Sequence, residues 1–306
     1  MTNFTVHVYR GEQDLSAMLD LIRVRPTAHV LDFPSLYDLH ELLGTASHRE
    51  NTQLWLGADG QLLGFAMLDL TFNTMWAEVL ANLPEAALFA ELVDWGLERL
   101  RQPHEPLRNA DVLQISYPDH HTQRIDWLKQ HGFVQQDWYT VQMTRRLDEP
   151  IPPPQPPPGF TIRHVTGEEE AEAMAALHCA AFNTTAMTTE SRLAVMRVPE
   201  YDQTLDWVAV APDGRLAAYV LGSISPEENA LAGIQRGYTD PVATHPDYHR
   251  RGLARAVLLT GLHVLKARGM TEAVLSTNSR NSAMQATAQA VGYHITGKRL
   301  FFQRHL

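Results

Sequence analysis

The segment His249–Ala254 has the composition of a site for a phosphate chain, because it contains a glycine turn between an expected strand and a long apolar helix. A turn of small residues lets the backbone come close to a ligand. The first N–H groups of the helix supply hydrogen-bond donors at the positive end of the helix dipole. Arg250, Arg251 and Arg255 add full positive charges beside these donors.

Two further patterns lie in the same half of the chain. Val242–Tyr248 leads into the turn as a strand followed by Pro-Asp, and Asn281-Ser282-Ala283 is followed by Gly292-Tyr293. Together with the turn, these residues resemble the GNAT acyltransferase superfamily over roughly residues 160–306. In that family the strand, turn and helix bind the pyrophosphate of acetyl-CoA, and an Asn-x-Ala helix lines the acyl side. The chain departs from the family at His249, where glutamine or arginine is usual.

The resemblance implies an enzyme, a GNAT-type N-acetyltransferase that moves an acetyl group directly from acetyl-CoA to a primary amine of a small molecule or peptide. It implies that N–H groups of the turn hold the pyrophosphate, that Val242 and Thr244 pair with the pantetheine amides, and that an N–H near Val242 or Ala243 stabilises the oxyanion. Asp240 is the leading candidate for the general base, because the family commonly has a carboxylate there. The residues implied in acetyl-CoA binding are Val242, Ala243, Thr244, His249, Arg250, Arg251, Gly252, Leu253, Ala254, Arg255 and Asn281.

The assignment of the base has alternatives. Asp240 precedes Pro241 and is also typical of a turn that enters a strand. The other candidates for the proton acceptor are Tyr238, Glu227, Glu228 and, more remotely, the C-terminal carboxylate of Leu306.

Two positions on the last expected helix leave further alternatives open. Asn281 is expected either to contact the pantetheine or thioester, or to cap the helix Ser282–Ala290. Thr287 stands where the family often has a tyrosine that protonates the leaving thiolate, so no general acid is identified. The alternative function is therefore a noncatalytic acyl-CoA-binding protein, a sensor or interaction module with the same fold.

The proline-rich segment 150–159 divides the chain into two halves with similar patterns. Phe160-Thr161-Ile162 repeats Phe4-Thr5-Val6 with an offset of 156, and Asp213-Gly214 repeats Asp59-Gly60 between two expected strands. We therefore expect two tandem GNAT-like domains, at 1–149 and 160–306, joined by an extended polyproline linker. Each is expected to be an α/β domain with a mixed, mostly antiparallel central sheet flanked by helices.

The N-terminal copy lacks the pattern of the phosphate turn. At the corresponding place, Ala86–Ala90 contains neither glycine nor arginine. We therefore predict that this degenerate copy does not bind CoA and instead acts as a scaffold or shapes the substrate site.

Composition argues against several other classes of protein. The net charge of −10 disfavours a nucleic-acid partner. No apolar run of about 18 residues is present, so we expect a cytoplasmic protein without membrane contact. Cys179, the single cysteine, can form neither an internal disulfide nor a cysteine-based zinc cluster.

The histidines predict no metal site. His245 and His249 are four residues apart, but Pro246 prevents the helical turn that would bring both rings to one ion. The sequence leaves a homodimer open.

Overall fold

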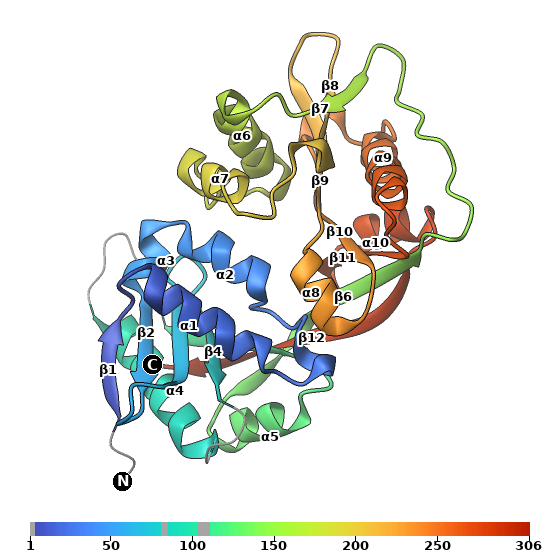
Figure 1. Ribbon diagram of the computed structural model, residues 1–306. Coiled ribbons are helices and arrows are strands. Elements are labelled where there is room, and N and C mark those ends of the chain that lie inside the picture. The colour runs from blue at the N-terminus through green and yellow to red at the C-terminus, as the bar shows by residue number, and fades with distance from the viewer. Residues whose placement is uncertain (1–3, 81–84, 103–110) are drawn as a thin grey trace. The chain divides into compact units, whose positions relative to one another are not determined.

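The computed structural model describes residues 4–80, 85–102 and 111–306, which form two compact units (Figure 1). Unit 1 comprises Met1–Tyr139 and Arg299–Leu306, and unit 2 comprises Thr140–Lys298. Each unit therefore contains a short segment from the other half of the sequence.

Unit 1 is a mixed sheet with helices. Its strands follow the order β1-β2-β3-β4-β5-β12, in which β4 and β5 are parallel and the other neighbours are antiparallel. Its elements are β1 (Thr5–Val8), α1 (Glu12–Arg23), η1 (Thr27–His29), α2 (Leu36–Leu43), α3 (Ala46–Glu50), β2 (Thr52–Leu56), β3 (Leu62–Asp69), β4 (Thr74–Val79), α4 (Glu85–Arg101), β5 (Val112–Pro118), α5 (Thr122–Gln130) and the first part of β6 (Val134–Arg146).

Unit 2 has a sheet of the same kind. Its strands follow the order β12-β6-β11-β10-β9-β8-β7, with β10 and β11 parallel. Its further elements are β7 (Thr161–His164), η2 (Glu168–Glu170), α6 (Ala171–Phe182), α7 (Thr189–Met196), η3 (Gln203–Leu205), β8 (Asp206–Val210), β9 (Leu216–Ser223), α8 (Pro226–Ala232), β10 (Arg236–Thr244), η4 (Pro246–Tyr248), α9 (Leu253–Ala267), β11 (Glu272–Asn278), α10 (Ser282–Gln289) and β12 (His294–His305).

The first five strands of each unit have the same order and the same directions. In both, four consecutive strands are antiparallel neighbours and the fifth is parallel to the fourth. The predicted α/β fold, with a mostly antiparallel mixed sheet present in two copies, is confirmed. Among the described residues, no helix has the length and apolarity needed to cross a membrane.

The last strand of each half completes the sheet of the other unit. In unit 2, residues 140–146 of β6 pair antiparallel with β11, and in unit 1, residues 299–305 of β12 pair antiparallel with β5. Phe302 is fully buried in the core of unit 1, in one cluster with Leu113 and Ile115. The end of the chain therefore stabilises the fold of the N-terminal half.

Helix α9 packs closely against the sheet of unit 2, because two glycines leave room for it. A Cβ on Gly237 would lie 2.5 Å from a methyl group of Leu265, and a Cβ on Gly261 would lie 3.4 Å from Thr239 Cγ2. Nine of the fifteen residues of α9 are buried. This packing fixes the position of the N-terminus of α9 relative to the end of β10.

The proline-rich segment contacts helix α9 near its start. Residues 150–157 have no regular secondary structure. His263 Nε2 lies 3.0 Å from the carbonyl oxygen of Pro152, and Lys266 Nζ donates to the carbonyl oxygen of Glu149 at 3.4 Å. The segment therefore begins along helix α9.

The exchange of the last strands predicts that a mutation near the C-terminus destabilises the N-terminal half. Phe302→Ala is expected to lower the free energy of unfolding by about 3–5 kcal/mol, because it removes a buried aromatic side chain from the core of unit 1. Denaturant unfolding would measure the loss, and hydrogen–deuterium exchange would locate it in β2–β5.

Phe301→Ala is the matched control, since its partly buried ring stacks on Trp138 instead of entering this core. Faster exchange of unit 2 alone in the Phe302 variant would contradict the assignment of β12 to the sheet of unit 1.

Candidate active site

The parallel strands β10 and β11 separate part-way along their length. They pair over three residues, ending with Tyr238 opposite Val274, and among the described residues no pair follows although both strands continue. On its other side β10 stays paired with β9, with a register shift between Thr239 and Val242. Backbone groups of β10 that face the gap are therefore available to an extended ligand.

Asp240 lies at the start of this gap. Its Oδ2 accepts a hydrogen bond of 3.0 Å from the backbone N–H of Ser276 on β11. The side chain is accessible to solvent, but the surrounding protein removes enough hydration to raise the pKa of Asp240 to about 7, against the opposing effect of the Ser276 hydrogen bond. Near neutral pH this carboxyl group can therefore accept a proton.

The turn before α9 leaves the N-terminus of the helix open. Arg250 and Gly252 are in the left-handed backbone region, with φ of 61° and 82°. Gly252 caps α9 without a side-chain hydrogen bond, and a Cβ on it would meet no described atom within 4 Å. Arg250, Arg251 and Arg255 are exposed around this space. The donors, the helix dipole and the charges together can bind a phosphate chain.

His249 and Tyr248 hold the turn in place. His249 Nε2 lies 3.0 Å from the carbonyl oxygen of Thr244, so the ring connects the turn to the end of β10. The Tyr248 ring is buried, and its hydroxyl donates to Asp213 at 3.1 Å. The guanidinium of Arg251 lies 5.7 Å from the centroid of the Tyr248 ring. The histidine that departs from the family pattern therefore supports the backbone of the turn.

His245 acts separately from His249. Its Nδ1 accepts a hydrogen bond of 3.2 Å from the backbone N–H of Asp247 and caps η4. The two rings are thus engaged with different backbone groups and do not converge on one point.

Helix α10 begins at a capping asparagine. Asn281 Oδ1 accepts a hydrogen bond of 3.0 Å from the backbone N–H of Met284, which is the capping alternative of the two that the sequence left open. The hydroxyl of Thr287 donates to the carbonyl oxygen of Ala283 at 2.9 Å. Because this hydroxyl is engaged in its own helix, it does not replace the tyrosine acid of the family.

Tyr293 connects the end of α10 to the site, a role that the sequence patterns did not reveal. Its hydroxyl lies 2.7 Å from Thr239 Oγ1, next to Asp240. Burial raises the pKa of Tyr293 well above its usual value, so the phenol stays protonated. The Gly-Tyr pair marked this residue in the sequence, but only its place in the fold shows the contact.

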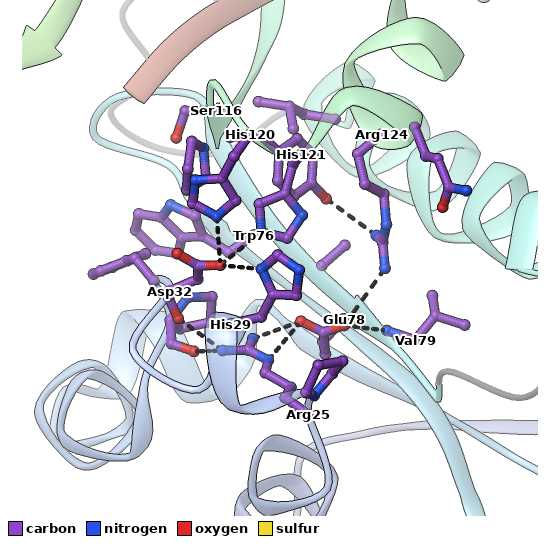
Figure 2. A pocket seen from close by; sticks show the side chains of 18 of the residues that line it. Arg25, His29, Asp32, Trp76, Glu78, Val79, Ser116, His120, His121 and Arg124 are labelled. Carbon is purple, nitrogen blue, oxygen red and sulfur yellow. Dashed lines mark hydrogen bonds and ion pairs between the residues drawn. The ribbon is translucent and has the colours of Figure 1, made fainter. Parts of the chain in front are cut away.

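In unit 1 the strands β4 and β5 also separate, but other side chains line the gap between them. Strands β4 and β5 pair over two residues only. A cavity of about 430 Å³ follows, lined by β4, β5, the start of α5 and the segment after α1 (Figure 2). Within it, Glu78 forms ion pairs with Arg25 at 2.5 Å and with Arg124 at 3.4 Å. The gap of unit 1 therefore carries its own internal charge network.

The two gaps correspond in sequence as well as in position. His121 precedes α5 by one residue, as Asn281 precedes α10, and each stands eleven residues before a Gly-aromatic pair. Ala86–Ala90 form part of helix α4, and residues 81–84 before them lie outside the described part of the chain. Unit 1 thus keeps the backbone arrangement of unit 2 while its side chains differ.

Residues 171–293 match the acetyltransferase (GNAT) family. These residues, which make up most of unit 2, belong to the GNAT acetyltransferase superfamily. The matched residues include the separated strands, the turn before α9 and helix α10, all in unit 2. The family implies that this GNAT acetyltransferase uses acetyl-CoA.

Relatives and solved structures extend the likeness over most of the chain. A mycothiol acetyltransferase of Saccharomonospora viridis is 24% identical over 248 residues, 78% of each protein, and one of Salinispora tropica is 26% identical over 257 residues, 77% of this chain and 76% of the relative. A tandem GNAT protein from the clavulanic acid biosynthesis pathway has a TM-score of 0.69 with 15% identity, covering 100% of this chain and 98% of its own. A GCN5-related N-acetyltransferase from Sphaerobacter thermophilus has a TM-score of 0.67 with 21% identity, covering 99% and 95%. The tandem fold of the GNAT acetyltransferase is therefore shared over its whole length.

The open space before α9 predicts that a carboxylate there blocks cofactor binding. Gly252→Asp is expected to weaken acetyl-CoA binding by at least about tenfold, because it places a negative charge where the helix N-terminus and three arginines attract phosphate. Isothermal titration calorimetry with acetyl-CoA measures the change.

Gly269→Asp is the matched control. Gly269 follows the other end of α9 and has the same φ of 82°, and a Cβ on it would likewise meet no described atom within 4 Å. Both variants carry the same backbone strain, so equal losses of affinity would show that the turn has no special role.

Proposed function

We propose that this GNAT acetyltransferase transfers the acetyl group of acetyl-CoA to a primary amine of a small molecule or peptide, by direct attack of the amine in unit 2. The observation that carries the proposal is the position of Asp240, whose carboxyl group lies at the start of the gap between β10 and β11 and accepts a hydrogen bond from Ser276. Desolvation in this position raises its pKa to about 7. A base with such a pKa can take a proton at neutral pH and release it again.

The turn and the open edge of β10 hold the cofactor. The N–H groups from Arg250 to Arg255 bind the pyrophosphate, and the arginine side chains balance its charge. Val242 and Thr244 pair with the pantetheine amides, as a neighbouring strand would. An N–H near Val242 or Ala243 donates to the thioester oxygen as it becomes an oxyanion.

Asp240 takes a proton from the incoming ammonium group, directly or through one water molecule. The free amine then attacks the thioester carbon and forms a C–N bond in a tetrahedral intermediate. As the C–S bond breaks, the second ammonium proton passes to solvent water, which leaves the neutral amide and the CoA thiolate. Thiols have a pKa of about 8.5, so the thiolate can leave without a protein acid. This agrees with a Thr287 hydroxyl that is engaged in its own helix.

A small amine is the first class of acceptor to test. Two relatives that cover more than three quarters of this chain are named mycothiol acetyltransferases, which makes an acceptor of the mycothiol type the first compound to test.

We propose that residues 1–149 and 160–306 are the two copies of the domain, joined by 150–159, and that only the second copy uses acetyl-CoA.

The pKa of Asp240 predicts the pH dependence of the reaction. The ionised carboxylate is the active form, so kcat/KM is expected to fall about tenfold per pH unit below pH 7. In Asp240→Asn, turnover is expected to drop by about 10²–10⁴ and this limb of the profile to disappear, while acetyl-CoA affinity changes little. Steady-state rates from pH 5.5 to about 9 with one amine measure both effects.

Asp148→Asn provides the control, because Asp148 is an exposed carboxylate of the same unit that pairs with Arg146. An Asp240→Asn enzyme with the wild-type profile would remove Asp240 from the role of base. Saturable acetyl-CoA binding without turnover on any amine of a broad panel would favour the noncatalytic alternative.

A further inference from the structure

Four side chains from two distant segments converge at one edge of the cavity of unit 1 (Figure 2). His29 ends η1 and Asp32 follows in the next loop, whereas His120 and His121 lie between β5 and α5. Asp32 Oδ2 lies 2.6 Å from His121 Nε2, 3.0 Å from His29 Nδ1 and 3.4 Å from His120 Nε2. The four potential ligand atoms all lie within 4.8 Å of one another.

Hydrogen bonds to Asp32 alone cannot pair all three histidines well. One carboxylate oxygen has about two lone-pair sites, whereas three imidazole nitrogens surround Asp32 Oδ2. The three rings also crowd together, with centroids 4.3–5.2 Å apart. A cation at the centre would use all four groups at once.

The ligand set and its spacing fit a tetrahedral divalent transition metal. Three imidazole nitrogens and one carboxylate oxygen are ligands that zinc prefers, at roughly 2.0–2.2 Å. Tetrahedral geometry at that length separates the ligand atoms from one another by about 3.4 Å. The three oxygen–nitrogen distances, 2.6, 3.0 and 3.4 Å, lie at or below this value, so rotations that move the rings apart by about 1 Å would complete the site.

The surroundings support the ligands and leave a path to them. Arg25 Nη1 donates to the carbonyl oxygens of Asp32 at 2.7 Å and of Pro34 at 2.9 Å, and the same guanidinium pairs with Glu78. The hydrogen bonds from Arg25 therefore hold the backbone of the loop that carries Asp32, as outer-shell hydrogen bonds commonly do around metal ligands. The side chain of His120 is 51% exposed, which gives an ion access from solvent.

We propose that unit 1 binds one divalent transition metal ion of the zinc class through His29 Nδ1, Asp32 Oδ2, His120 Nε2 and His121 Nε2. With four protein ligands the site is structural, and it ties the segment after α1 to the start of α5. The ion lies in the gap that corresponds to the proposed acetyl-CoA site of unit 2. This site stands independently of the proposed function, because no residue of unit 2 contributes to it.

The test uses the full chain, freed of any affinity tag and stripped of metal by a chelator. Titration with zinc chloride by calorimetry is expected to give one ion per chain and a rise in melting temperature of several degrees. Cobalt chloride is expected to give the intense visible absorption of tetrahedral Co²⁺. Binding of several ions per chain, or of none at micromolar concentration, would overturn the proposal.

Two variants and a control assign the ligands. Asp32→Asn, which keeps the shape of the side chain, and His121→Ala are each expected to weaken zinc binding at least about tenfold. His131→Ala is the control, since His131 is an exposed histidine of the same unit that stacks on Trp127 outside the cluster. Unchanged acetyl-CoA affinity shows that each variant is folded in unit 2, and circular dichroism with β5 hydrogen exchange checks unit 1. Wild-type zinc affinity in both ligand variants would show that the four residues form a hydrogen-bonded cluster only.

Discussion

The separation of β10 from β11 is the constraint that determines the geometry of the site. Pairing ends after Tyr238 and Val274, and the pairing of β10 with β9 on its other side has a register shift between Thr239 and Val242. Close packing of α9 at Gly237 and Gly261 then holds the open N-terminus of that helix beside the end of β10. The strand separation and the packing of α9 together place the free edge of β10, Asp240 and the turn before α9 in one unit of the fold.

The same backbone feature is used twice with different side chains. In unit 2 the gap opens to a turn with glycine and arginines, whereas in unit 1 it contains a Glu78 charge network and a cluster of histidines around Asp32. His121 stands at the place of Asn281, so the end of the fifth strand carries an imidazole in one copy and a capping amide in the other. The duplicated fold has therefore diverged in what its gap can bind, while the exchanged strands β6 and β12 link the stability of the two halves.

Features that are local in sequence were predictable. The glycine turn, the strand before it, the helix after it and the repeat of both halves all follow from short patterns, and the α/β fold followed from them. The exchange of β6 and β12 could not be predicted, because the sequence pattern of a strand does not specify which strand it pairs with. The histidine cluster was also missed, since His120 is 88 residues from Asp32 and only the fold brings them together, and attention to spacing selected His245 and His249 instead. The pKa of Asp240 depends on how strongly the folded protein desolvates its carboxyl group, which no local pattern reports.

Hydrogen–deuterium exchange with and without acetyl-CoA would show which of the two gaps the cofactor occupies, and with it whether unit 2 is the active copy. We predict slower exchange on binding at residues 242–244 and 250–255 of unit 2, where backbone N–H groups are expected to meet the pantetheine and the pyrophosphate. No change is expected at 76–79 and 115–124 around the cavity of unit 1. Protection of the unit 1 segments, with none at the turn before α9, would contradict the assignment of the cofactor to unit 2.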